Sequence, residues 1–148
     1  MLSCETTHFG PMEYDPTSAI HFAEGIPGFE SEQRFLVIQR PDQHPLVFLQ
    51  SLETVSLCFP ALPVHAIEPG YQPMMASRDL ELLGFTAQPV IGKDAIFLAL
   101  IAVHDNPTAN LLAPVVVNLA TCAAAQCVDA ELRYSHRYSL LERLERAS

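Results

Sequence analysis

The sequence is poor in basic residues. Its 148 residues include 8 Lys and Arg against 17 Asp and Glu, which gives a formal net charge of −9. The imbalance lies in residues 1–130, where 4 basic residues stand against 14 acidic ones. Because a polyphosphate backbone repels such a chain, we expect no direct binding of nucleic acid. An ordinary acidic globular protein has this balance too, and so does a protein whose body attracts a basic partner.

A long apolar run is also missing. The longest, Ile96–Val103, has eight residues, whereas a helix that crosses a bilayer needs about 20. The first ten residues contain neither the basic nor the apolar region of a secretion signal. We therefore expect a cytoplasmic protein with no membrane segment, in which the four cysteines stay reduced.

Metal and catalytic signatures are absent from the sequence. The cysteines show no C-x-x-C spacing, and no two of the six histidines stand four residues apart. None of the motifs G-x-S-x-G, G-x-G-x-x-G, H-E-x-x-H or the Walker loop occurs. We expect no enzyme, and no catalytic, cofactor-binding or metal-binding residue. One alternative stays open, a small hydrolase or ligand-binding β-barrel that uses Ser135 and His136 with an acid such as Asp129, provided that these side chains converge in space.

Glycine is scarce and proline abundant, with six and twelve residues. Because an interior proline breaks a helix, the prolines between residues 11 and 114 confine long helices to the last 34 residues. Short runs rich in Val, Ile, Phe and Leu predict strands instead. They are Ile20–Phe22, Phe35–Gln39, Leu46–Gln50, Val55–Phe59, Ile96–Val103, Leu111–Asn118 and Gln126–Glu131. The prediction is an all-β fold, a small antiparallel β-barrel in a single domain.

Two of these runs indicate where they lie in the sheet. Ile96–Val103 is apolar on both faces, which is typical of a central strand. Leu111–Asn118 contains Pro114, which cannot donate to a ladder, so we expect an edge strand or a bulge there. An edge strand could dock some other protein, which is a further alternative for the function.

The sequence predicts two helices. Ser77 is a suitable N-cap for Arg78–Leu83, and Gly84 is placed to end that helix. Three leucines near the C-terminus form a stripe that fits an amphipathic helix, packed on its own barrel or on a partner. The expected division is a flexible leader over residues 1–11, a β domain over 12–139 and a helical tail over 140–148.

Several segments, in the right order, resemble a known family, that of the flagellar assembly factor FliW. Its two signatures are similar to Phe22–Glu30 (FAEGIPGFE) and Thr108–Asn118 (TANLLAPVVVN). Between and after them, Leu49–Glu53 resembles L-Q-S-x-E, Leu82–Gly84 follows Tyr71 at the expected place, and Arg133–Arg137 resembles R-Y-S-x-R. The likeness covers about residues 12 to 140.

The resemblance implies a cytoplasmic, non-enzymatic, β-barrel-like protein. It further implies binding to the translational repressor CsrA, which relieves repression of flagellin synthesis, and a chaperone-like binding of flagellin. An RNA-binding protein such as CsrA needs positive charge, so an acidic body would attract it. We expect a monomer when unbound. The candidate partner-binding residues are the polar and aromatic ones of the motifs, namely Glu30, Gln50, Glu53, Tyr71, Asn110, Tyr134 and Arg137.

Three segments differ from the family pattern. Phe59–His65 lacks the acidic residue that usually precedes a proline there, and Leu119–Ala125 lacks the usual Lys and Arg. The His-Pro expected after the final arginine is Tyr138-Ser139. Contacts that depend on those groups are not available to this chain.

Overall fold

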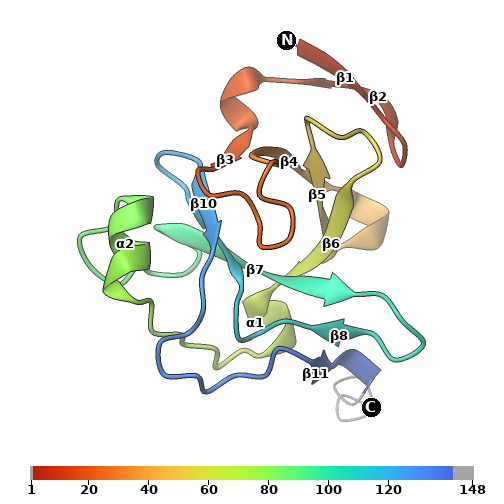
Figure 1. The fold of residues 1–148 in the computed structure, drawn as a ribbon. Coiled ribbons are helices and arrows are strands. Elements are labelled where there is room, and N and C mark those ends of the chain that lie inside the picture. The colour runs from red at the N-terminus through yellow and green to blue at the C-terminus, as the bar shows by residue number, and fades with distance from the viewer. Residues whose placement is uncertain (1, 142–148) are drawn as a thin grey trace.

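A closed β-barrel forms the body of the molecule in the computed structural model, which describes residues 2–141 (Figure 1). Within those residues the barrel has seven strands, in the order β7-β6-β5-β4-β3-β10-β9, and β9 pairs back onto β7. All neighbours are antiparallel except β3 and β10, which are parallel. The strands are β3 (Ile20–Phe22), β4 (Arg34–Gln39), β5 (Val47–Ser51), β6 (Cys58–Pro63), β7 (Ala95–Ala102), β9 (Val115–Asn118) and β10 (Ala123–Gln126).

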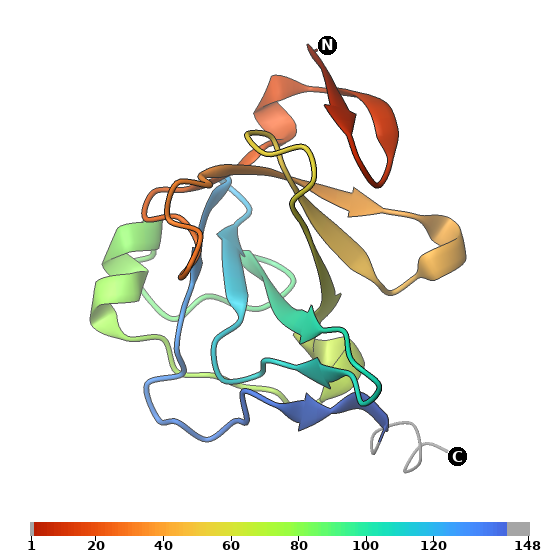
Figure 2. The ribbon, with the colours of Figure 1, turned by 45° about the vertical axis from the view of Figure 1, so that its right-hand side comes forward.

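Smaller elements surround the barrel. A separate hairpin stands at one end of the barrel, and the last strand lies at the opposite end (Figures 1 and 2). These elements are β1 (Leu2–Thr6), β2 (Gly10–Tyr14), the 3-10 turns η1 (Pro16–Ser18) and η2 (Pro41–Gln43), the helices α1 (Val64–Ile67) and α2 (Ser77–Leu83), and the short strands β8 (Thr108–Ala109) and β11 (Tyr138–Ser139). Among the described residues, no helix has the length and apolar character needed to cross a membrane.

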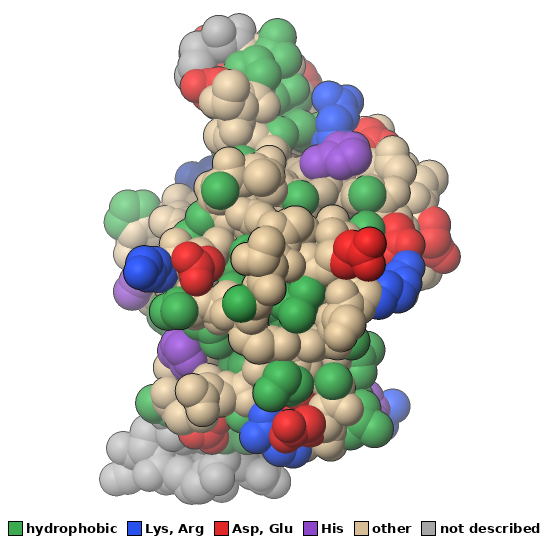
Figure 3. Space-filling view, turned by 90° about the vertical axis from the view of Figure 1, so that its left-hand side faces the viewer, with side chains coloured by type: hydrophobic (Ala, Val, Ile, Leu, Met, Phe, Trp, Pro, Cys, Tyr) green, Lys and Arg blue, Asp and Glu red, His purple; other side chains and the backbone are tan. Residues whose placement is uncertain are grey.

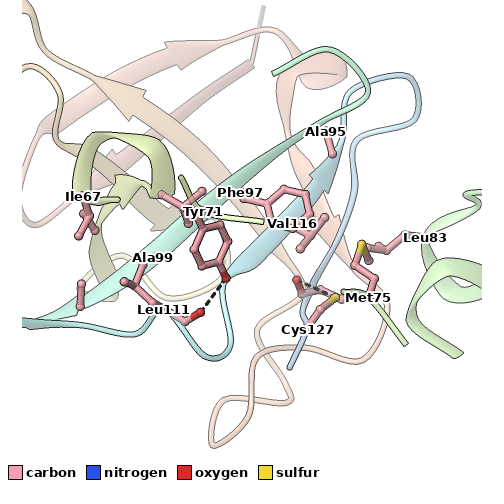
Figure 4. Close-up of a cluster of buried hydrophobic side chains, with 13 residues drawn as sticks. Ile67, Tyr71, Met75, Leu83, Ala95, Phe97, Ala99, Leu111, Val116 and Cys127 are labelled. Atoms are coloured by element: carbon pink, nitrogen blue, oxygen red, sulfur yellow. Dashed lines mark hydrogen bonds between the residues drawn. The ribbon is translucent and has the colours of Figure 1, made fainter. Parts of the chain in front are cut away.

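Strand β7 separates two buried clusters. Leu98 points into the barrel, where it belongs to a cluster with Phe22, Phe35 and Leu49. Phe97 belongs to the other cluster, which lies between the barrel wall and the segment that carries α1 and α2 (Figure 4). Both faces of β7 are therefore buried, which explains its continuous apolar run and confirms the predicted central strand.

Other predicted strands are shifted or partly wrong. The strands expected over 20–22, 35–39 and 46–50 are present within one residue. The strand expected over 55–59 runs instead over 58–63, because residues 52–57 form a turn. The one expected over 126–131 is replaced by β10, over Ala123–Gln126, whose three alanines have low strand propensity.

Of the two alternatives expected around Pro114, an edge strand or a bulge, the edge strand is wrong. Only residues 115–118 form a strand, and this strand, β9, lies between β10 and β7 in the closed barrel. Pro114 is fully buried just before it, and its carbonyl oxygen accepts a hydrogen bond from the N–H of Cys127 at 2.9 Å. This strand therefore offers no free edge to another protein.

The local predictions at the helix and the termini have mixed outcomes. Helix α2 begins at Ser77 itself, with Ala76 as N-cap and no side-chain cap, whereas Gly84 ends it at a φ of 78° as expected. From Leu2 on, the expected leader forms the hairpin of β1 and β2. Leu140 and Leu141 are helical, and the rest of the expected tail, residues 142–148, lies outside the described residues.

Candidate protein-binding site

A groove of about 760 Å³ lies beside α1, at the end of the barrel away from the N-terminal hairpin. Its walls are residues 69–74 and 88–91, and Glu131 and Arg133 stand at its rim. Met74 and Val90 line it with 40% and 56% of their surface exposed. Exposed apolar side chains in a concave surface are typical of a site for another protein.

Asp129 fixes one wall of this groove. Its carboxylate is buried and accepts hydrogen bonds from the backbone N–H groups of Met74 at 2.8 Å and Arg133 at 3.1 Å. The N–H of Glu131 approaches the same carboxylate at 3.4 Å, and the Arg133 guanidinium lies 3.8 Å from it. We call these contacts the Asp129 clasp; they hold residues 129–133 against residues 72–75.

The electrostatics of the clasp favour the ionised carboxylate. Burial by itself raises the pKa of Asp129, but the N–H donors of Met74, Arg133 and Glu131 and the Arg133 guanidinium outweigh it. The pKa of Asp129 is therefore lower than its ordinary value of 3.8. A carboxylate that accepts several N–H groups is stabilised in its charged form.

Tyr71 lines the groove, and Tyr134 packs against it. The Tyr71 hydroxyl is buried and donates to the carbonyl oxygen of Leu111 at 2.6 Å (Figure 4). Its ring lies 4.3 Å from that of Tyr134, whose hydroxyl accepts from the N–H of Gln72 at 2.9 Å. Burial is the main cause that raises the pKa of Tyr71, so this phenol remains a donor. Of the predicted partner-binding residues, these two are brought into contact.

The motif Leu49–Glu53 has a structural role. Glu53 accepts from the N–H groups of Gln33 and Arg34 at 2.8 and 2.7 Å, so it caps the start of β4. Gln50 is fully buried and donates to the carbonyl oxygens of Ser51 and Val55, at 3.0 and 3.2 Å. Gln50 therefore contributes no side-chain surface in this structure, and its role in partner binding stays a prediction.

The first signature, Phe22–Glu30, folds back on itself at the barrel. Ile26 is buried in the inner cluster, while the exposed Phe29 ring lies 5.2 Å from Phe59. Gly25 has a φ of 69°, and a Cβ at this position would stand 2.5 Å from the Cα of Glu30. Glycine is therefore required here for close approach of the backbone. The Glu30 side chain is exposed at this turn, away from the groove's walls.

Asn110 directly follows β8 in the second signature, and Arg137 directly precedes β11, the strand that pairs with β8. Asn110 is half-buried, and its Oδ1 accepts from the N–H of Ala113 at 2.9 Å, which forms a local turn. Arg137 is exposed and lines a separate pocket with His104 and His136. Neither residue lines the groove.

The residues of the hydrolase alternative are not brought together. The Asp129 carboxylate faces Met74, Glu131 and Arg133, whereas the Ser135 hydroxyl accepts from the N–H of Arg137 at 3.0 Å. Within residues 2–141 no hydrogen bond joins Asp129, Ser135 and His136 into a triad. In the same residues, no group of three or more His, Cys, Asp or Glu is arranged to hold a metal ion.

No motif in the sequence predicts the groove. Met74 and Val90 lie in segments before and after α2 that contain proline and glutamine and carry no motif, and the fold places both residues along the same groove. The one available signal was an apolar residue among loop residues. Such a residue is common on protein surfaces and indicates nothing alone.

Charged side chains form no single patch on the face shown in Figure 3. Figure 3 shows acidic and basic side chains scattered among neutral ones on the side seen there. One pair on the surface is Glu24 with Arg78, which joins the first signature to α2 at 2.5 Å. The face seen in Figure 3 therefore has no patch of a single sign of charge.

A match to a known family agrees with these features. The family model described as FliW protein matches residues 3–140. The chain belongs to the FliW family. The "Flagellar assembly factor FliW" of Bdellovibrio bacteriovorus is 32% identical over 143 residues, which cover 95% of this chain and 79% of that relative. That of Thermotoga neapolitana is 30% identical over 146 residues, covering 96% of this chain and 95% of that relative.

A solved structure supports the same relationship. The crystal structure of a flagellar assembly factor FliW superimposes with a TM-score of 0.83 at 29% identity, over 93% of this chain and 96% of that one. The family resemblance and the all-β barrel expected from the sequence are thus confirmed. The barrel also explains the FliW signatures, which supply a tight turn, a cap and buried strand residues.

Proposed function

We propose that this chain is a cytoplasmic flagellar assembly factor that acts by binding proteins and catalyses no reaction. It binds CsrA and thereby relieves repression of flagellin synthesis, and it binds flagellin in a chaperone-like way. The membership in the FliW family, whose relatives carry the name flagellar assembly factor, is the observation that supports this proposal.

The charge of the chain supports the CsrA part of the proposal. A protein that binds RNA presents basic surface to phosphates. A body with a formal charge of −9 attracts such a surface and disfavours RNA itself. The association rate with CsrA should fall as salt rises, because ions screen charges beyond about 8–10 Å at physiological ionic strength.

The groove supports the flagellin part of the proposal. A subunit that assembles into a filament carries apolar surface which is buried only in the polymer. Before assembly, a second protein can cover that surface with an apolar groove of its own. Met74 and Val90 offer such contacts, and the Asp129 clasp holds one of the walls in place before binding.

Calorimetric titration and gel filtration against CsrA and flagellin of the same organism test the proposal. The expected results are heat and co-elution with each protein, and release of flagellin messenger RNA from CsrA when the chain is added. Absence of heat and co-elution with both proteins would overturn it.

A pair of matched variants tests the assignment of the groove. Val90→Asp places a charge in the groove and should weaken flagellin binding at least tenfold, because a desolvated charge in an apolar contact is costly. Val103→Asp makes the same change at a side chain that is 72% exposed outside the groove, and should leave binding unchanged. Equal affinities of the two variants would exclude the groove as the flagellin site.

A further inference from the structure

The N-terminal hairpin is a two-stranded sheet separate from the barrel. Its tip is docked on the turn after β5, where the N–H of Thr7 donates to the carbonyl oxygen of Val55 at 2.9 Å. The Phe9 ring also lies 5.4 Å from Phe48, on the outer face of β5. The strands themselves project beyond the end of the barrel (Figures 1 and 2). An isolated two-stranded hairpin is only marginally stable, so an added strand would stabilise it.

The two edges of the hairpin differ because of one proline. Pro11, in β2, is the partner of Glu5 in β1 and has no N–H group. Antiparallel pairs alternate between those that exchange both hydrogen bonds and those whose groups point outward. The pair of Glu5 and Pro11 must be of the outward kind, and so must that of Ser3 and Glu13. Pro11 therefore blocks the outer edge of β2, as prolines do on protected edges.

The outer edge of β1 is open. By the same alternation, the N–H and carbonyl groups of Ser3 and Glu5 point to this edge, and both residues are exposed. Within the described part of the chain, no third strand pairs with the hairpin. Unpaired edge groups of this kind can accept an extended segment of another protein.

The charge around this edge selects a basic occupant. Residues 1–33 contain no Lys or Arg, and the first basic residue is Arg34. Of the acidic residues in this stretch, Glu5, Glu13 and Asp15 lie in the hairpin or directly after it, whereas Glu24 is paired with Arg78 and Glu32 is buried against Ser51 and Thr54. The Arg40 guanidinium lies over the Phe9 ring at the tip of the hairpin. Glu5 lies on the open strand itself, and Glu13 lies opposite Ser3 on the neighbouring strand. Two copies of such a strand would repel each other, whereas a segment with Lys or Arg would be attracted.

We infer that the open edge of β1 binds a basic, extended segment of a partner protein, which adds to the hairpin as a third strand. The inference rests on the proposed function, in which the basic partner is CsrA. Backbone hydrogen bonds to Ser3 and Glu5 hold the segment, and the carboxylates of Glu5 and Glu13 select its charge. Flagellin, in the groove at the opposite end, does not use this edge.

Proline substitutions at the two edges test this inference. Ser3→Pro removes an outward N–H from the open edge without changing the charge, and Ser3→Ala is its control. CsrA should bind Ser3→Pro at least tenfold more weakly than Ser3→Ala, as measured by calorimetry. At the blocked edge, Glu13→Pro should bind CsrA as well as Glu13→Gln does, because Pro11 already prevents pairing there. Hydrogen exchange of the Cys4 and Met12 amides, which face the interior of the hairpin, reports whether the hairpin is still formed.

The outcomes separate the inference from the proposed function. Suppose that the unmodified chain binds CsrA. If the Ser3→Pro variant keeps its hairpin and its affinity for CsrA is within twofold of that of Ser3→Ala, the open edge is not the site. The inference is equally overturned if the unmodified chain forms a dimer that Ser3→Pro abolishes, because the occupant is then a second copy. If the unmodified chain does not bind CsrA at all, the CsrA part of the proposed function fails and the inference fails with it.

Discussion

The two ends of the barrel are built in different ways. At the groove end, the buried carboxylate of Asp129 and the hydroxyl of Tyr71 tie three segments together through donors and acceptors that are all paired. At the hairpin end, two strands rest on the barrel through their tip, where Phe9 contacts Phe48 and the Arg40 guanidinium. Buried, satisfied polar groups fix a surface before a partner arrives, whereas a weakly attached hairpin can adjust to one. We therefore expect substitutions at the groove end to lower the free energy of unfolding of the whole molecule, and substitutions at the hairpin end to release only the hairpin.

Removal of the Asp129 carboxylate should have the largest effect. Asp129→Ala leaves the N–H groups of Met74 and Arg133 without their acceptor, and should lower the free energy of unfolding by about 3–5 kcal/mol. Denaturation in guanidinium chloride measures the loss. The control, Asp129→Asn, keeps one acceptor oxygen and should lose less. A loss below about 1 kcal/mol for the alanine variant would contradict the role of the clasp.

Loss of the buried tyrosine hydroxyl should rank next. Tyr71→Phe leaves the carbonyl oxygen of Leu111 without its donor, and we expect a loss of about 1–2 kcal/mol in the same assay. Tyr134→Phe is the matched control, since its hydroxyl pairs with the N–H of the exposed Gln72, which water can reach. That variant should lose about 0.5 kcal/mol or less. Equal losses would show that burial of the Tyr71 bond does not matter.

A smaller effect should appear in the pH dependence of stability. The pKa of Asp129 is lowered in the folded chain, so its ionised form stabilises the fold above pH 3.8, its ordinary value. That contribution should disappear as the pH falls through the lowered pKa. The stability difference between the unmodified chain and Asp129→Asn, measured between pH 7 and pH 2, should therefore shrink only below about pH 4. A difference that is constant down to pH 2 would rule out this linkage.

The hairpin should give the smallest change in global stability. Phe9→Ala removes the contacts of the ring with Phe48 and with the Arg40 guanidinium, and we expect a loss below about 1 kcal/mol because only the hairpin is released. Cys58, beneath Phe9 in the same small pocket, should then react faster with an alkylating reagent. Burial raises the pKa of both the Cys58 and Cys127 thiols, that of Cys127 to about 12, so Cys127 provides an unreactive internal control. Mass spectrometry distinguishes the four cysteines, and a faster reaction of Cys127 as well would mean that the whole barrel opens.

The barrel was predictable from local patterns, and its closure was not. The run Ile96–Val103 and the glycine after α2 indicated a buried strand and a helix end, and both are present. The alanines of β10 have no pattern of a strand; they belong to one because Val115–Val117 and Ile20–Phe22 stand on either side. Val115–Val117 precede β10 by only a short turn, but Ile20–Phe22 are about 100 residues away in the chain, beyond the reach of any local pattern.

The burial of Gln50 could not be predicted from local sequence patterns either. Its position in β5 alternates with Val47 and Leu49, which point inward, so Gln50 points outward and would normally be exposed. It is buried because the turn after β5 folds over it, and the hairpin tip docks on that same turn. Tyr71 and Tyr134 are 63 residues apart in the sequence, and only the fold brings the centroids of their rings to 4.3 Å from each other.

The parallel pairing of β3 with β10 sets the order in which the chain can fold during synthesis. Strand β3 is made early, yet Phe22 finds its partner Ala124 only after most of the chain has left the ribosome. Until then β3, β4, β5, β6, β7 and β9 can form only an open sheet, whose edges at β3 and β9 remain unpaired. Such long-range closure is slow. Truncation before residue 123 should therefore yield a chain that aggregates rather than a smaller barrel. The pairing of the short alanine strand β10 is then the step that closes the barrel.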